Sequence, residues 1–307
     1  SLAAERDQAK KLYSALTGNT ANKFQADFYE NLLKQNKPGE AARHIIDANK
    51  GFYNVTLKNF FTPMSNEDRT TFAPLNDMTA TMIGVTRDET NFFKICYEDS
   101  RYQFDGELIT NDISNLPSEF NKHRATQDWY FLRDLGVAVP KYNRTKNDMY
   151  KIAEEGNVPL GDRQYFKKSQ QMAYTTTKPG AIAGIFSTRA FAKAFYDAGT
   201  NRAPFANFAK NFMCKDMEEL NDVTIPDCRV RRDVDRSPGG SSATFKTFCV
   251  GCHAGQDGLG GAFVYYDYVD GTMVYSDHIS SDQNGNVITV GPCGVPTLLF
   301  PQFLEEN

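Results

Sequence analysis

The sequence has few of the residues that ligate metals or recognise nucleic acids. It contains only four histidines and one tryptophan in 307 residues, and its formal net charge is −4. With no broad basic excess, nucleic acid is not an expected partner. No apolar run approaches the roughly 18 residues needed to cross a bilayer; the longest are 180–186 and 294–304. We therefore expect no membrane span.

Several catalytic motifs are also missing. There is no G-x-S-x-G, no H-E-x-x-H and no phosphate-binding loop. No signal peptide is visible at the start, and the chain begins "SLAAERDQAKK" without methionine, which fits either a processed mature chain or a trimmed one.

The composition that remains is that of an ordinary folded protein. The length suits one or two domains with a real hydrophobic core. Aromatic residues make up 13% of the chain, with 23 Phe and 15 Tyr. An aromatic-rich core, an apolar cofactor pocket or a contact surface would each explain this excess.

Apolar residues recur at helical spacing through most of the chain, which predicts a mainly α-helical body. Asn76 or Asp77 is a plausible N-cap, "KPG" at 37–39 is a stop signal, and Pro63 should bias Thr62 away from helix. The predicted helices are 3–16, 22–36, 40–50, two within 73–99, 187–199 and 203–220.

The C-terminal part of the chain has a different composition. "SPGGSS" at 237–242 is a flexible link, and the later sequence is rich in β-branched and aromatic residues with "DG" and "NG" turn signals. We predict one or two short β-hairpins there. We divide the chain into a helical module, 1–175, and a second module, 176–307, which could also form one integrated domain.

One short motif carries the chemistry. Cys249, Cys252 and His253 follow the order C-x-x-C-H. In c-type haem attachment, two such thiols add to the porphyrin vinyl groups and the neighbouring imidazole ligates the iron. From the composition, chance would produce this motif on the order of 0.002 times in a chain of this length. The sequence therefore predicts one covalently attached haem c per chain.

Two other uses of paired cysteines are less well supported. A zinc site needs a second, tightly spaced ligand pair, but downstream only His278 and Cys293 are present, fifteen residues apart. A dithiol redox site is expected in a βαβ setting, and the linker and glycines around the motif do not supply one.

The residues after the motif resemble a known sequence signature. Planctomycete-type cytochrome c modules, whose function is largely unassigned, carry C-x-x-C-H-x-x-x-D-P-L-G-F-A-L-E-x-F-D-x-x-G. The strong resemblance covers about residues 180–271, and a looser one covers most of the chain. The matching residues are Cys249, Cys252, His253, Asp257, Leu259, Gly260, Ala262, Tyr266, Asp267 and Gly271.

The chain also departs from that signature. Gly258 stands for the usual Pro, Gly261 for Phe and Val264 for Glu, and the last glycine falls one place later. The resemblance implies a cytochrome c-like haem segment on a helical body. The departures leave any shared catalytic or partner-binding role open.

The second axial position of the iron decides the function. A Met or His ligand gives an electron-transfer centre, whereas an open position permits ligand or peroxide chemistry. His278 is our first candidate and Met273 our second, and the upstream residues Met64, Met78 and Met82 are further candidates. Arginines near the motif are candidates for pairing with the haem propionates, although a solvated surface role is the simpler interpretation of them: Arg229, Arg231, Arg232 and Arg236.

Aromatic residues around the motif have two interpretations. Phe248, Phe263, Tyr265 and Tyr266 could wall an apolar haem pocket or could simply pack as strand residues.

The other four cysteines could form two disulfides or stay as buried free thiols. Cys214 with Cys228 would close a local loop, and Cys96 with Cys293 would tie the front of the chain to its tail. Disulfides and haem attachment both suit an oxidising compartment.

The function that we expect is a periplasmic or extracellular bacterial monohaem cytochrome that passes single electrons to a redox partner protein. We expect an electron carrier more than an enzyme. The alternatives are a peroxidase-like haem enzyme with an open sixth position and a structural subunit of an extracellular assembly that contains haem and could self-assemble.

Overall fold

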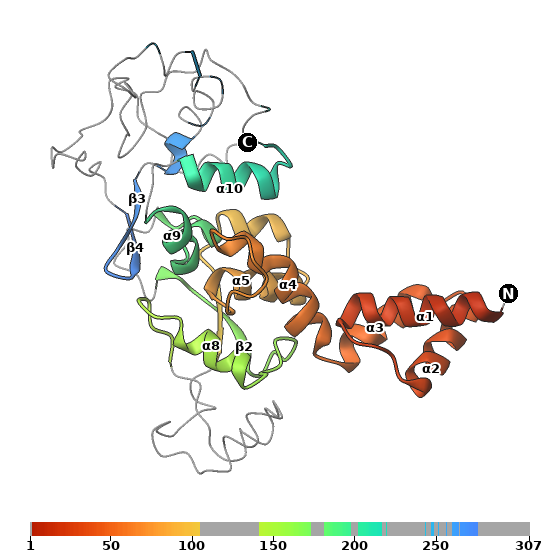
Figure 1. Ribbon diagram of the computed structural model, residues 1–307. Helices are drawn as coiled ribbons and strands as arrows, with labels where there is room; N and C mark the ends of the chain where they lie inside the picture. Colours follow the sequence, from red (N-terminus) through yellow and green to blue (C-terminus); the bar gives the residue numbers. More distant parts are fainter. Residues whose placement is uncertain are drawn as a thin grey trace.

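The structure of the protein is a computed structural model (Figure 1). It describes 2–104, 141–172, 181–197, 202–216, 260–263 and 265–275, with the single positions 219, 243, 247, 248, 251 and 256. These residues are mainly helical, as predicted, and they include two small antiparallel sheets.

The longer helices and the strands account for most of the described chain. The helices are α1 (Leu2–Thr17), α2 (Lys23–Lys34), α3 (Pro38–Ala48), α4 (Lys58–Phe61), α5 (Asp77–Arg87), α8 (Asp148–Glu155), α9 (Arg189–Phe195) and α10 (Arg202–Phe212). The strands are β1 (Arg101–Phe104), β2 (Phe166–Ser169), β3 (Tyr266–Val269) and β4 (Thr272–Tyr275). Shorter helical turns are η1 (Phe52–Leu57), η2 (Thr62–Ser65), η3 (Phe92–Cys96), η8 (Gly184–Ser187) and η12 (Gly260–Phe263).

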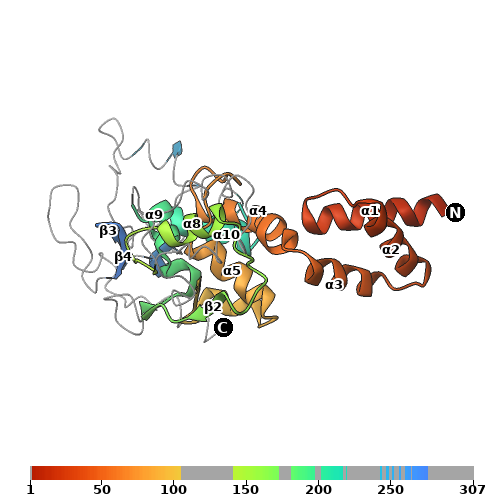
Figure 2. The same cartoon turned by 90° about the horizontal axis from the view of Figure 1, so that it is seen from below.

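The first three helices form a small unit with its own core. They lie to one side of the remaining elements in both views (Figures 1 and 2). Asn22 caps α2 by accepting from the backbone N–H of Gln25, whose side chain accepts in return from the Asn22 N–H. The core residues of this unit are Ala9, Tyr13, Ala21, Ala26, Tyr29, Leu32, Ala41 and Ile45.

The preceding helix α2 ends at Lys34, before the predicted stop signal at 37–39, but two prolines differ in detail from the prediction. Pro38 lies at the first turn of α3 and begins that helix, because proline's fixed φ suits the first helical position, where no N–H bond is needed. Pro63 does not turn Thr62 out of helix: Thr62 has φ −56° and ψ −41°. Instead, the chain changes there from α-helix to the 3₁₀ turn η2.

Helix α5 is the centre of the main body. It is buried along nearly its whole length and is packed by α4, α9, η8 and β1. Asn76 is its N-cap, as predicted, and accepts from the backbone N–H of Thr79 at 3.0 Å. Gly84 lies directly under the ring of Tyr102 on β1, where a Cβ would overlap that ring. Glycine therefore allows the β1–β2 sheet to approach α5 closely.

The predicted hairpin after the motif is confirmed at its "DG" signal. Strand β3 pairs antiparallel with β4 through a two-residue turn, Asp270–Gly271, and both turn residues have positive φ. That backbone is the I′ type for which Asp-Gly is preferred. The sheet of β1 and β2 was not predicted, and the "NG" turn at 284–285 lies outside the described residues.

The main core extends across position 175, the proposed boundary between modules. It joins residues of α5 and α8 with residues of α9, η12 and the β3–β4 hairpin. In the part of the chain that the structure describes, no helix is both long and apolar enough to cross a membrane.

Candidate functional site

The residues that would attach haem lie outside the described part of the chain. This applies to Cys249, Cys252 and His253, and also to His278. Phe248, directly before the first cysteine, is 80% exposed. His253 precedes Gly260 by seven residues, so their Cα atoms lie within about 25 Å of each other by chain length alone. Residues 260–263 are the first continuous described stretch after the motif.

Phe263 anchors this stretch to the main core. It is the last residue of η12 and is 1% exposed. Its ring centroid lies 5.9 Å from that of Phe186 on η8, 6.5 Å from Phe191 on α9 and 6.4 Å from Tyr196. These separations are typical of packed aromatic pairs. The chain shortly after the motif is thus held against α9.

A continuous group of aromatic rings extends from this contact. Tyr196 stacks on Tyr266 of β3, with centroids 5.6 Å apart and planes 14° apart. On the other side, Phe186 makes edge contacts with Phe208 and Phe212 of α10 at 5.6 and 5.7 Å. Of the residues proposed to wall a pocket, Phe263 and Tyr266 are buried in this packing. We call the group the aromatic cluster: Phe186, Phe191, Phe195, Tyr196, Phe208, Phe212, Phe263 and Tyr266.

Sequence patterns identify the helices of this cluster but not its role. The amphipathic pattern over 187–199 predicts one apolar face. In the structure, Ala190, Phe191, Ala192 and Phe195 of α9 are all buried, because α5 and the β3–β4 hairpin both pack against this helix. The signal available in the sequence is the high density of Phe between positions 186 and 212.

Burial shifts the acid–base behaviour of the tyrosines here. It raises the pKa of Tyr266 well above the ordinary value of 10.0, and it raises the pKa of Tyr275 to about 12. Both side chains are neutral phenols near pH 7. They present rings and a hydroxyl to their surroundings and no charge.

Met273, the second candidate axial ligand, is a buried residue of β4. It is 4% exposed, pairs across the sheet with Tyr268, and belongs to the main core. It also lines a small polar cavity together with Thr272.

The disulfide candidates are only partly described. Cys96, in η3, is buried and Cys214 is exposed, and neither forms a disulfide with another described residue. Their proposed partners, Cys293 and Cys228, lie outside the described residues, so the pairings stay predictions. The propionate candidates Arg229, Arg231, Arg232 and Arg236 lie there too.

The described histidine has a local role. His44 on α3 lies 3.2 Å from the Tyr29 hydroxyl, measured from Nδ1, and its ring packs on Phe28. Among the described residues, no group of three or more His, Cys, Asp or Glu side chains is placed to hold a metal ion. The donor set that suits iron porphyrin is that of the motif: two thiols for the macrocycle and one imidazole for the metal.

Comparisons with known proteins gave no relative. No family model, no curated protein and no solved structure matches the chain.

Proposed function

We propose that the chain is a monohaem c-type cytochrome that carries single electrons in the periplasm or outside the bacterial cell. The observation that carries this proposal is the order Cys249, Cys252, His253 in a chain with only four histidines. Cys249 and Cys252 would hold the macrocycle covalently, and His253 would ligate the iron. When bound, the haem supplies one-electron chemistry.

The packing after the motif supports this assignment. Phe263 and Tyr266 are held in the aromatic cluster, so the chain is tied to the main core from ten residues after His253. Buried phenols and phenyl rings give apolar surroundings, which raise the reduction potential of a haem by disfavouring the more charged ferric state. The redox partner would be a protein.

Optical spectroscopy tests the proposal. The full chain, produced with haem-attachment machinery, should show haem absorbance that stays with the polypeptide after denaturation, because the attachment is covalent. Replacing both cysteines, C249A with C252A, should abolish that covalent absorbance, whereas C214A should leave it unchanged. A wild-type chain without haem absorbance would refute the proposal.

Carbon monoxide separates the electron carrier from a haem enzyme. The spectrum of the dithionite-reduced protein should not change on addition of carbon monoxide, because a sixth ligand blocks the iron. A shift would mean an open or labile position and would favour the peroxidase-like alternative.

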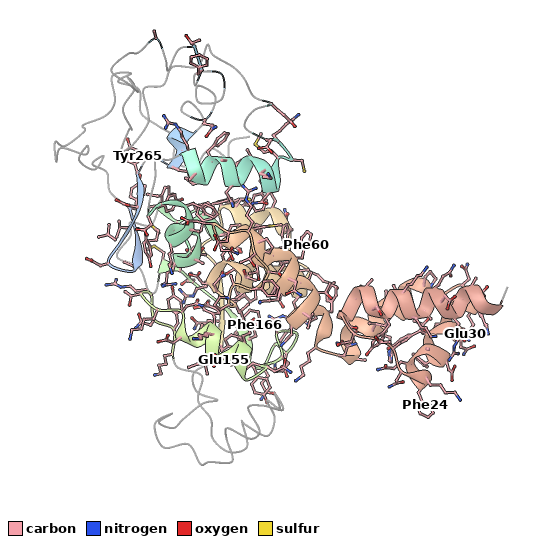
Figure 3. All side chains as sticks on the ribbon, in the orientation of Figure 1. Phe24, Glu30, Phe60, Glu155, Phe166 and Tyr265 are labelled. Atoms are coloured by element: carbon pink, nitrogen blue, oxygen red, sulfur yellow. The ribbon has the colours of Figure 1, made fainter. Side chains whose placement is uncertain are left out.

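A structural subunit is a second candidate because of the N-terminal unit. Helices α1–α3 extend away from the main body, and α2 presents Phe24, which is 83% exposed (Figure 3). Phe28, four residues later on the same helix, is half-exposed. Exposed aromatic side chains on a projecting unit suit contact with another subunit. Analytical ultracentrifugation should then show self-association in the wild type and a monomer in F24S. A monomeric wild type would remove this candidate.

A further inference from the structure

A small polar cavity lies beside the β3–β4 hairpin. Its volume is about 20 Å³, which is room for about one water molecule or one small polar group. It is enclosed by the starts of α5, β1 and α9, by the loop before α8, and by strand β4. This space is therefore built from segments far apart in the sequence.

Positive charge dominates the described lining of this cavity. Three arginines contribute to it, Arg101, Arg144 and Arg189, against one acid, Asp77. The Asp77 carboxylate already accepts from the backbone N–H groups of Arg189 and Ala190. Its oxygens are thus committed to capping α9.

Arg189 supplies a donor that the fold leaves unused. Its Nε is buried and has no hydrogen-bond partner among the residues that the structure describes. Buried polar atoms in native proteins are normally hydrogen-bonded, so one without a partner needs an explanation, such as a bound ion or water. The two other guanidinium groups differ in depth: Arg144 is exposed, whereas Arg101 is 2% exposed and lies 3.5 Å from the ring centroid of Tyr142.

The hydrogen-bonding groups on the neutral side of the cavity are already engaged. The Ser187 hydroxyl lies 2.9 Å from Gln171 Oε1 and accepts from the Ala183 N–H at 3.0 Å. The Thr188 hydroxyl donates to the Ile185 carbonyl. The guanidinium groups of Arg144 and Arg189 are therefore the donors best placed to serve a ligand.

We propose that this cavity binds a single carboxylate group, which accepts from Arg189 and Arg144 above the buried charge of Arg101. The planar guanidinium fork matches a carboxylate in two parallel hydrogen bonds. The carboxylate could come from a haem propionate or from a free carboxylic acid, and the small volume admits only the carboxylate end of either. In the first case the inference rests on the proposed function; in the second it does not.

Calorimetric titration of the full-length protein with acetate tests for a free ligand. If the site is open, wild type binds acetate and R144Q and R189Q weaken binding roughly tenfold or more, since each removes charged hydrogen bonds. R43Q is the matched control: its side chain is 75% exposed and lies on α3, outside this cavity. R144Q, an exposed position, keeps the test informative if R189Q fails to fold.

The reduction potential of the haem tests for a propionate. If a propionate fills the site, the wild-type protein does not bind acetate. The reduction potential of its haem then falls over the pH range in which that propionate ionises. An arginine partner lowers a carboxyl pKa, so R144Q and R189Q should move this fall to higher pH while R43Q leaves it in place. If acetate does not bind and both variants keep the wild-type pH profile, the inference is wrong.

The two proposals can fail separately. A chain without haem that still binds acetate, with binding weakened by R144Q, refutes the cytochrome and keeps the carboxylate site. A chain without haem that does not bind acetate refutes both.

Discussion

Asp77 caps helix α9 from a position 112 residues earlier in the chain. The backbone N–H of Arg189 donates to Asp77 Oδ2 at 2.7 Å, and that of Ala190 donates to Oδ1 at 3.0 Å. The same Oδ1 also accepts from the N–H of Met78. One buried carboxylate therefore joins the start of α5 to the helix that carries Phe191, and through it to the segment after the C-x-x-C-H motif.

Removing this carboxylate should destabilise the main body. Asp77→Ala leaves buried N–H groups at the start of α9 without acceptors, so we expect a loss of about 2–4 kcal/mol in the free energy of unfolding. Urea unfolding measures it. Asn22→Ala, which removes an exposed cap from α2, is the control and should cost about 1 kcal/mol. Equal losses of free energy in the two variants would show that the buried Asp77 cap stabilises the protein no more than an exposed helix cap does.

A second acid links stability to pH. Burial alone would raise the pKa of Asp88, but hydrogen bonds from Arg87, Tyr102 and Arg163 outweigh it, so the pKa lies below the ordinary value of 3.8. This contribution to stability is present above about pH 4 and is lost as the pH falls through the lowered pKa.

Asp88→Asn should therefore reduce the loss of stability on acidification. Unfolding free energies measured between about pH 5 and pH 2 should fall less steeply in this variant than in wild type. Asp68→Asn, at an exposed loop position, should keep the wild-type slope. An unchanged slope in the Asp88 variant would contradict the assignment.

The elements whose signals are local were predictable from the sequence. The 3.6-residue spacing located α1, α2 and α5, and the side chain of Asn76 marked a helix start. The Asp270–Gly271 turn was equally clear, since few dipeptides accept two positive φ values. The motif at 249–253 is also local, so the proposed haem chemistry follows from five adjacent positions.

The elements that depend on distant residues were not predictable. Strand β1 pairs with β2 more than 60 residues later, with Arg101 opposite Ser169, and four-residue strands carry little periodicity of their own. The small polar cavity lined by Arg144 and Arg189 was not predicted for the same reason. Arg144 and Arg189 are 45 positions apart, and only the packing of α9 against its neighbours brings them together.

Gly184 is a glycine that the fold requires. Its φ is +52°, and a Cβ there would overlap the carbonyl oxygen of Ile95. Its own carbonyl accepts from Gln171 Nε2 at 2.7 Å. We expect Gly184→Ala to lower the free energy of unfolding by about 2 kcal/mol or more, through both backbone strain and overlap.

Gly39 provides the matched comparison. It lies in α3, and a Cβ there would meet nothing within 4 Å. Gly39→Ala should therefore be neutral or stabilising by up to about 1 kcal/mol, because alanine favours helix. Thermal unfolding of both variants should separate them clearly, and a neutral Gly184→Ala would contradict the close approach of the Ile95 carbonyl.

The two described thiols should react at very different rates. Burial raises the pKa of Cys96 to about 12, and only the thiolate is nucleophilic. In reduced, folded protein at pH 8, iodoacetamide should modify the exposed Cys214 and should reach Cys96 only after unfolding. Peptide mass spectrometry measures both. The proposed disulfides would be established if, without prior reduction, neither cysteine is labelled and peptides linking Cys214 to Cys228 and Cys96 to Cys293 are recovered. Labelling of Cys214 under these conditions would exclude its disulfide.

If the chain carries the proposed haem, paired substitutions at His278 and Met273 assign the sixth ligand of its iron. Met273 is buried between the main core and the small polar cavity lined by Arg144 and Arg189, so we interpret it as a packing residue. Met273→Leu nearly conserves volume and should cost less than about 1.5 kcal/mol, with the reduced spectrum still unaffected by carbon monoxide. His278→Gln should open the iron to carbon monoxide, because amide side chains are poor ligands for ferrous haem. Carbon monoxide binding in Met273→Leu alone would reverse the assignment, and binding in neither variant would place the ligand elsewhere in the helical body.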